Sequence, residues 1–420
     1  MLSPEFDAQQ TTPKGVRRIQ RTTILLLFLA GIVNFLDRGS LSIANLAIRH
    51  DLHLSGTQIG LLASVFSFSY GLAQLPIGAW LDRFGARILL GTGLLVWSGA
   101  QAATAFVGGY SQFLPLRILL GVGEAPFFPA GIQSIKGWFP QDRRGRPTGV
   151  MNASTMLGQA IAPPILTGLM LSAGWRAMFG VIGLAGILLA LAWFPLYRDP
   201  KSVQLAEQAF QQKGEAREWV SLFRSRNVWG MVLGFSGINY TGWLYLTWLP
   251  NYLEVERHVS VARTGVLAAL PFLLGALGMY SSGFVSDVLT RHGRDPLQTR
   301  KSQIVVGMVL SAAFTFLVPN AATALGAVWL VGGALFCVHF AGTAAWGLVQ
   351  FSAPSEQIAS VASIQNFGSF MVATIAPVLT GIILDRTHSF RISLLICSAV
   401  TLAGAAAYAF LVRGPIRAKP

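Results

Sequence analysis

The chain has 420 residues, of which 53% are hydrophobic and only 11% are charged, and its formal net charge is +14. Soluble domains carry about 25% charged residues, so this composition excludes an ordinary soluble protein and indicates a polytopic membrane protein. The positive charge lies in short loops between apolar runs, and no basic groove with interleaved aromatic residues is visible, so we expect no nucleic-acid partner.

Apolar segments that are long enough to cross a bilayer recur along the whole chain, since a membrane-spanning helix needs about 20 residues. We therefore predict an all-α polytopic membrane protein, in multi-pass form, in the inner (plasma) membrane of a bacterium. The twelve predicted spans are 22–46, 57–79, 88–107, 111–135, 147–171, 175–197, 228–252, 262–286, 302–320, 323–349, 357–384 and 389–412.

The longest polar interval, residues 198–227, predicts a cytoplasmic linker between two six-helix halves at 22–197 and 228–412, with tails at 1–21 and 413–420. Of the 31 Lys and Arg residues, 23 lie in the tails and the even-numbered loops and 6 in the odd-numbered loops. Basic residues concentrate in the cytoplasmic loops of membrane proteins. Both termini are therefore predicted to be cytoplasmic.

Four charged residues interrupt the apolar spans. The stretch "NFLDRGS" places Asp37 and Arg38 inside the first span, and Arg117 and Glu124 lie inside the fourth. Each would cost roughly 2.5–3.5 kcal/mol at a helix centre on an insertion scale, which favours paired residues that face a cavity. At 1.5 Å per residue, Asp37 and Arg117 fall at a similar depth. We therefore assign Arg117 to Asp37, and Arg38 to an anionic substrate.

The chemistry of these residue types suggests coupled transport. The planar guanidinium of Arg38 fits a carboxylate, which makes it the candidate anchor for an organic anion. When an anion binds an arginine, that arginine holds a neighbouring carboxylate less strongly, so the carboxylate takes up a proton more readily. Asp37 and Glu124 are therefore the candidate proton-coupling residues.

A motif repeats after the second and the eighth spans. "GAWLDRFGAR" (78–87) and "GFVSDVLTRHGR" (283–294) are 205 residues apart, which is close to the spacing of the first and seventh spans. Repeated six-helix halves are a known transporter architecture, and a glycine lets another helix approach closely. One copy alone would suggest ordinary loop charges, but two copies favour ion pairs that hold the halves together. The predicted cytoplasmic gate comprises Gly78, Asp82, Arg83, Arg87, Asp287 and Arg291.

The repeated motif and the charged central interval resemble the major facilitator superfamily. Over nearly the whole chain, "NFLDRGSLSIA", "RILLGVGEAPFFPAG", "GWFPQDRRGRPTG" and "LTWLPNYL" resemble the anion:cation symporter family. Members of that family carry sugar acids and other organic anions, mostly with protons. The resemblance implies that spans 1, 4, 7 and 10 line a central cavity, which would bring the four buried charges around one chamber.

Polar side chains on otherwise apolar spans extend the candidate site, although each of them could instead bond one helix to another. By resemblance, Tyr70, Thr343 and Asn366 fall where sugar-acid carriers contact substrate. Phe35 and Thr155 differ from the galactonate-carrier pattern, which has Tyr and Gln there, so another aldonate, a uronate or a less polar acid is allowed. The candidate substrate-binding residues are Arg38, Tyr70, Gln74, Arg117, Thr155, Trp243, Thr343, Trp346 and Asn366.

Catalytic and nucleotide-binding motifs are absent from the sequence, so we expect no enzyme, cofactor or metal, and transport driven by a gradient. We predict a secondary transporter that imports a small organic anion, a sugar acid, by proton symport with alternating access, as a monomer in contact with membrane lipid. An anion exchanger or uniporter, a carrier of aromatic acids, and an intramembrane enzyme or sensor are the alternatives. A lone membrane His such as His339 favours a hydrogen-bonding role over titration.

Overall fold

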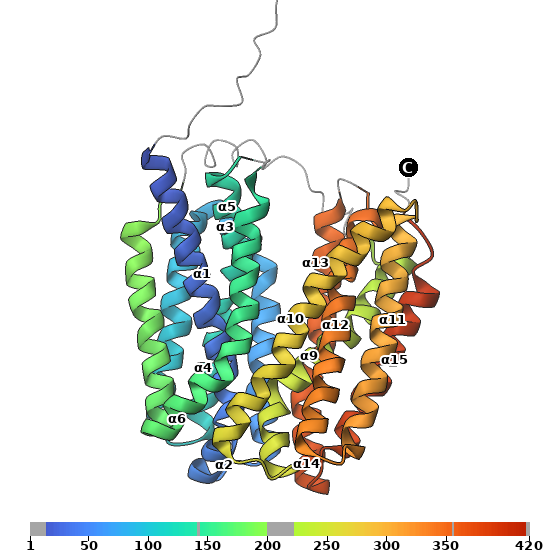
Figure 1. The fold of residues 1–420 in the computed structure, drawn as a ribbon. Coiled ribbons are helices and arrows are strands. Elements are labelled where there is room, and N and C mark those ends of the chain that lie inside the picture. The colour runs from blue at the N-terminus through green and yellow to red at the C-terminus, as the bar shows by residue number, and fades with distance from the viewer. Residues whose placement is uncertain (1–13, 141–142, 200–221, 355–356, 417–420) are drawn as a thin grey trace, which may run out of the picture.

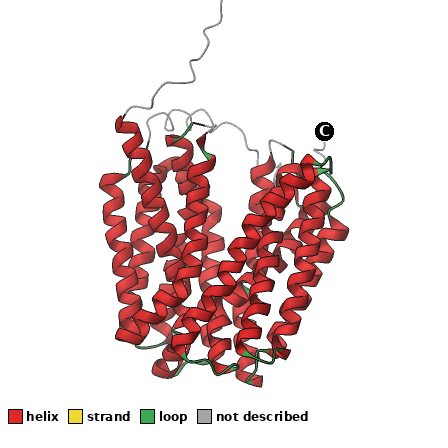
Figure 2. Ribbon diagram, in the orientation of Figure 1, coloured by secondary structure: helices red, strands yellow, loops and turns green. Residues whose placement is uncertain are grey.

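The computed structural model describes residues 14–140, 143–199, 222–354 and 357–416. Within these residues the chain forms helices joined by short turns, and no strand (Figure 2). Much of both predicted tails and of the predicted linker lies outside the described residues. The α-helices are α1 (Lys14–Ile43), α2 (Asn45–Leu52), α3 (Gly56–Ala103), α4 (Tyr110–Glu124), α5 (Phe127–Trp138), α6 (Gly145–Leu196), α9 (Arg226–Val255), α10 (Val261–Arg291), α11 (Pro296–Leu317), α12 (Ala324–Ser352), α13 (Ile358–Ala373), α14 (Ile375–Thr387) and α15 (Arg391–Leu411).

Two helices are much longer than a bilayer requires. α3 has 48 residues and α6 has 52, whereas about 20 residues span the hydrocarbon core. Each turns at a glycine with positive φ, Gly85 at 75° and Gly174 at 81°, a conformation that glycine adopts without steric cost. The sequence predicts a loop at 80–87 between the second and third spans, and the turn at Gly85 falls inside it. The two predicted spans are the two arms of α3, except that the third predicted span continues to residue 107 and α3 ends at Ala103.

Two other predicted spans each cover two helices. The fourth covers α4 and α5, which meet at Ala125 and Pro126, and the eleventh covers α13 and α14, which meet at Thr374; these residues keep right-handed helical dihedrals, so each pair continues as one span. Proline removes a backbone donor, so an irregularity in the helix beside Pro126 is expected. Within the described residues, nine helical segments are long and apolar enough to cross a membrane, the bent α3 and α6 among them. The protein is thus helical and multi-spanning.

The helices form two groups that lie side by side, α1–α6 and α9–α15 (Figure 1). α1 begins at the end of the bundle where the C-terminus also lies, at the top of Figure 1; we call this the terminal end and the opposite end the far end. Glycines allow close packing inside each group. A side chain at Gly123 of α4, for example, would lie 2.7 Å from the backbone nitrogen of Trp97.

Hydrogen bonds between the two halves follow α3. Among the described residues, every hydrogen bond between the halves except that from Ser42 to the Thr247 carbonyl joins α3 to α13, to α14 or to Thr374 between them. These bonds begin at Gly56, the first residue of α3 at the far end, and reach as far as Gln74. The halves are therefore bonded from the far end to the middle of the bundle.

Candidate functional site

Four buried charges of the N-terminal half meet at the middle of the bundle. The Nε of Arg38 donates to Oε2 of Glu124 at 2.7 Å, and these side chains are 8% and 0% exposed. Asp37 and Arg117 are also buried, and Arg117, Glu124 and Arg38 all act electrostatically on Asp37. The structure thus brings together the four charges that the sequence predicts to share one chamber.

The direct partner of Arg38 in this structure is a carboxylate of the protein, whereas the sequence assigns Arg38 to the substrate. That carboxylate belongs to Glu124, and the assignment of Arg117 to Asp37 stays a prediction. Arg117 and Glu124 both lie on α4, seven residues apart, and α4 ends at Glu124. α1 also begins at Lys14, earlier than the predicted start of the first span. Depth along each helix does not say which faces of α1 and α4 meet, and it is this facing that brings Arg38 onto Glu124.

Several polar atoms in this cluster have no hydrogen-bond partner among the described residues. They include both carboxylate oxygens of Asp37, Oε1 of Glu124, and the Nε and one terminal nitrogen of Arg117. Buried polar atoms are normally hydrogen-bonded, because burial without a partner is unfavourable. Such a concentration of unpartnered charged atoms is typical of a site that binds a polar ligand or a proton.

Aromatic rings surround the Arg38 guanidinium. Its carbon lies 5.2 Å from the ring centre of Phe35, 5.5 Å from that of Phe66 and 4.8 Å from that of Tyr70. Rings at this distance attract a cation and restrict the plane of the guanidinium. Phe66 is absent from the sequence-based candidates, although it lies one helical turn before Tyr70 and the spacing alone indicates a shared face.

Aromatic residues of the C-terminal half complete this wall. The Trp243 ring lies 5.8 Å from that of Phe66 and 6.2 Å from that of Phe370, which in turn lies 5.5 Å from Tyr70. A cavity of about 20 Å³ here is lined by Arg38, Arg117, Trp243 and their neighbours. This volume suits about one water molecule. A larger ligand at the two arginines therefore requires the aromatic side chains to move.

The predicted amides meet between the halves. The Nδ2 of Asn366 donates to Oε1 of Gln74 at 3.1 Å, and both side chains are only partly buried. By contrast, the hydroxyls of Thr155 and Thr343 donate to carbonyls of their own helices, at 2.7 and 3.1 Å. Trp346 is 43% exposed and packs edge-on against Phe235 at 5.5 Å.

His339 has a local partner. One of its ring nitrogens, Nδ1, lies 2.8 Å from the carbonyl of Leu335 on the same helix, and the ring packs beside Gly275 of α10. A partly buried histidine with a backbone partner agrees with the hydrogen-bonding role expected from the sequence.

The predicted cytoplasmic gate is not assembled in this structure. Asp82, Arg83, Asp287 and Arg291 are exposed, and no ion pair joins them within the described part of the chain. The close helix approach expected at Gly78 is also missing, because no atom lies within 4 Å of the place where its side chain would be.

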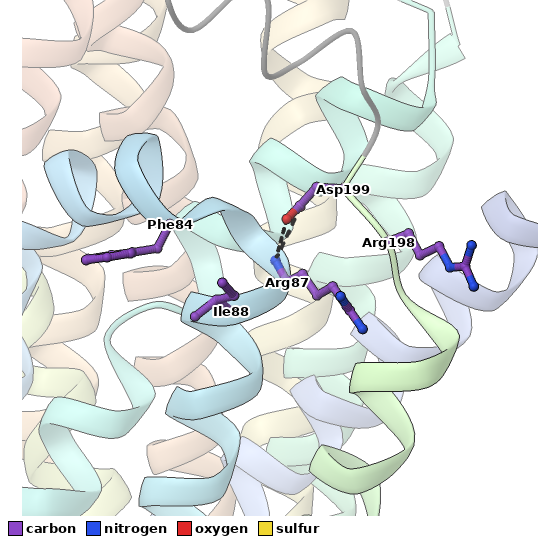
Figure 3. Close-up of a pocket in the computed structure, with 5 residues that line it drawn as sticks. All are labelled: Phe84, Arg87, Ile88, Arg198 and Asp199. Atoms are coloured by element: carbon purple, nitrogen blue, oxygen red, sulfur yellow. Dashed lines mark hydrogen bonds between the residues drawn. The ribbon is translucent and has the colours of Figure 1, made fainter.

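Arg87 instead ties α3 to the end of α6 within one half. Its Nε and NH2 donate to the Phe194 carbonyl at 3.0 and 2.7 Å. The Asp199 carboxylate accepts from the backbone nitrogen of Arg87, at 3.2 Å to each oxygen (Figure 3). Burial raises the pKa of Asp199, and the hydrogen bond from Arg87 opposes this effect. This network stiffens the terminal end of the N-terminal half and does not cross between the halves.

The sequence signature of the Major Facilitator Superfamily matches residues 27–373. The chain belongs to this superfamily. Over 99% of its length this superfamily member is 52% identical to the "Probable L-galactonate transporter" of Escherichia coli (strain K12), covering 94% of that protein. It is 33% identical to the "Hexuronate transporter" of Bacillus subtilis (strain 168), over 94% of this chain and 95% of the relative.

Solved structures share the fold of this superfamily member. The D-xylose-proton symporter superimposes with a TM-score of 0.79 at 14% identity, over 94% of this chain and 98% of that one. An inward-facing, unoccupied bacterial homolog of the human lysosomal transporter Spinster gives 0.74 at 19% identity, over 96% and 95% of the two chains. Together with its membrane-length apolar helices, this membership makes the protein a multi-pass integral membrane transporter and not an enzyme.

Proposed function

We propose that this protein imports a sugar acid across the bacterial inner membrane by proton symport with alternating access. The observation that carries the proposal is the buried pair of Arg38 and Glu124, in which a substrate anchor is joined to a group that can take a proton. The relatives named for L-galactonate and hexuronate support a sugar acid as substrate. Such a substrate offers a carboxylate and several hydroxyls.

Glu124 and the substrate carboxylate compete for the Arg38 guanidinium, and this competition couples substrate binding to proton binding. While Glu124 is ionised it occupies Arg38; when it is protonated it holds Arg38 less strongly, because hydrogen bonds between ionised groups are the stronger ones. The guanidinium is then available to bind the substrate carboxylate in a bidentate manner. Conversely, a substrate on Arg38 displaces Glu124, which then takes up a proton. The coupling is necessarily reciprocal.

The remaining buried charges have supporting roles in this scheme. Asp37 is the second proton-coupling residue, and Arg117 acts on it electrostatically from α4, so the ionisation of Asp37 responds to what Arg117 binds. The amides of Gln74 and Asn366 are placed to bind substrate hydroxyls from both halves. Trp243 offers an apolar ring beside Arg38 against which a sugar ring can pack.

Alternating access requires the two halves to rock about this site. We propose twelve spans with both termini in the cytoplasm, so the terminal end faces the cytoplasm and the far end faces outside. The hydrogen bonds along α3 then close the outer end, and the unassembled gate leaves the inner end free. In the opposite state the bonds at the far end break, and Asp82 and Asp287 become available to hold the inner end.

A thermal-shift screen of the purified protein tests the substrate class, because a ligand that binds the folded state stabilises it by about 2.7 kcal/mol at a hundred times its Kd. We expect L-galactonate or a hexuronate to raise the melting temperature and neutral galactose to leave it unchanged. Arg38→Lys should abolish most of the shift. Equal shifts with the acid and the neutral sugar would contradict an arginine-anchored anion.

A further inference from the structure

A carboxylate of the C-terminal half binds the first turn of α3 at the far end. Asp385, near the end of α14, accepts hydrogen bonds from the backbone nitrogens of Gly56 and Thr57, each at 2.7 Å, and from the Thr57 hydroxyl at 2.6 Å. Arg49 lies 3.8 Å from the same carboxylate. The first N–H groups of a helix have no partner within the helix and attract an anion, so this contact is favourable.

The backbones cross closely at this point. A side chain on Gly60 would overlap the carbonyl of Pro377, and one on Gly381 would overlap the carbonyl of Gly56. α3 and α14 therefore touch without intervening side chains. Because a hydrogen bond fails once its heavy atoms separate beyond about 3.5 Å, the three bonds to Asp385 exist only while the far end is closed.

The equivalent corner of the repeat lacks this charged contact. Gly265 of α10 lies 205 residues after Gly60 and meets Thr167 of α6, again at a close crossing between the halves. The residue that precedes α10, Ser260, makes no side-chain cap, and no carboxylate reaches that helix end in the described residues. Within the described chain, the pair of Arg49 and Asp385 is also the one ion pair that joins the halves.

We propose that Asp385 is a positioning residue for transport that holds the far end closed and so sets how often the carrier opens there. The identification of the far end as the outer face rests on the proposed function. In Asp385→Asn the closed state loses the ion pair and those hydrogen bonds that a single amide oxygen cannot accept, while the open state loses none of them. Substitution should therefore raise the fraction of molecules open at the far end.

Cysteine labelling measures that fraction without substrate or proton gradient. Ala63 of α3 is 6% exposed and lines the small cavity beside Arg38, about two turns inward from Gly56. Both native cysteines, Cys337 and Cys397, are buried and are replaced by alanine. Ala63→Cys is then labelled with a membrane-impermeant maleimide in right-side-out and in inside-out vesicles. We expect Asp385→Asn to raise the labelling rate from the far end about tenfold, the equivalent of about 1.4 kcal/mol.

Glu256→Gln is the matched control. The Glu256 carboxylate also binds the start of a helix, accepting from the Ser389 hydroxyl at 2.9 Å and the Phe390 nitrogen at 2.7 Å, but these contacts stay inside the C-terminal half. We expect no change in labelling for this variant, and a smaller rise for Thr57→Val, which removes only the hydroxyl donor.

The proposal is overturned if Asp385→Asn and Thr57→Val both label at the background rate. It is also overturned if Glu256→Gln accelerates labelling equally, because general loosening would then explain the effect. A rise seen only in inside-out vesicles supports the closing role of Asp385 and instead refutes the proposed orientation of the protein in the membrane.

Discussion

Glu124→Gln separates binding from coupling, because glutamine keeps the shape of glutamate and cannot release a proton. In the wild-type protein the Glu124 carboxylate accepts from Arg38 at 2.7 Å and is fully buried. We expect the variant to bind substrate but to lose accumulation driven by a pH gradient. The substitution changes the contact between Arg38 and Glu124, through which we propose that substrate binding and proton binding are coupled.

The bond strengths give a magnitude for the change in binding. A hydrogen bond to a charged group contributes about 1.5–3 kcal/mol, and one between neutral groups about 0.5–1.5 kcal/mol. Arg38 stays charged in the variant, so its bond to the amide is still charge-assisted and only part of this difference is lost; a loss of about 1 kcal/mol corresponds to about fivefold tighter binding. The gain should be seen at alkaline pH and disappear at acidic pH, where Glu124 is protonated.

Calorimetric titration of L-galactonate at two pH values measures this binding, and counterflow in proteoliposomes shows that the variant still carries substrate. Asp51→Asn is the control, since it removes an exposed carboxylate that pairs with Arg176 in the same half. The reasoning is refuted if Glu124→Gln binds with wild-type affinity at alkaline pH. If the variant still concentrates substrate in a pH-dependent way, Glu124 is not the coupling site and Asp37 bears that role alone.

Three further substitutions test other parts of the scheme. Arg38→Lys should weaken binding about ten- to a hundredfold at every pH, since losing a hydrogen bond to a charged group costs roughly 1.5–3 kcal/mol; unchanged affinity in direct titration would contradict the anchor role. Arg117→Lys should change the pH profile of uptake more than affinity, because it acts on Asp37; if it abolishes binding at every pH while Arg38→Lys binds normally, the roles are exchanged. Burial raises the pKa of Asp199, so the stability that its bound proton contributes is present at low pH and is lost as the pH rises through the raised pKa. Asp199→Asn should remove this loss of stability, so its melting temperature should exceed that of the wild type at about pH 8 but not at about pH 4. The same difference in melting temperature at both pH values would contradict the raised pKa of Asp199.

The sequence predicts that this is a polytopic membrane protein with a buried cluster of charged residues, and both predictions have a physical reason. Charged residues are costly inside apolar spans, so Asp37, Arg38, Arg117 and Glu124 stand out without any knowledge of the fold, and the structure brings them together. Membership of the superfamily, expected from the repeated motif, is confirmed. The exact count of twelve spans and the cytoplasmic termini remain predictions.

The contacts of Glu124, Phe66 and Asp385 depend on local geometry that the sequence does not reveal. The choice of Glu124 as partner of Arg38 depends on which faces of α1 and α4 meet, which the spacing along one helix does not give. Phe66 resembles any core aromatic in an apolar span until its distance to Arg38 is known. Asp385 resembles an ordinary charge at a helix end, because its partners include backbone N–H groups, which every non-proline residue has.

Simultaneous recording of substrate and proton movement tests the proposed symport most directly. Proteoliposomes in lightly buffered medium, with no imposed gradient, receive labelled L-galactonate or a hexuronate while the external pH is followed. We expect the medium to become more alkaline as label enters, and both signals to respond together to the proton gradient. Entry of label without any proton movement would contradict the symport and show an exchanger or uniporter instead.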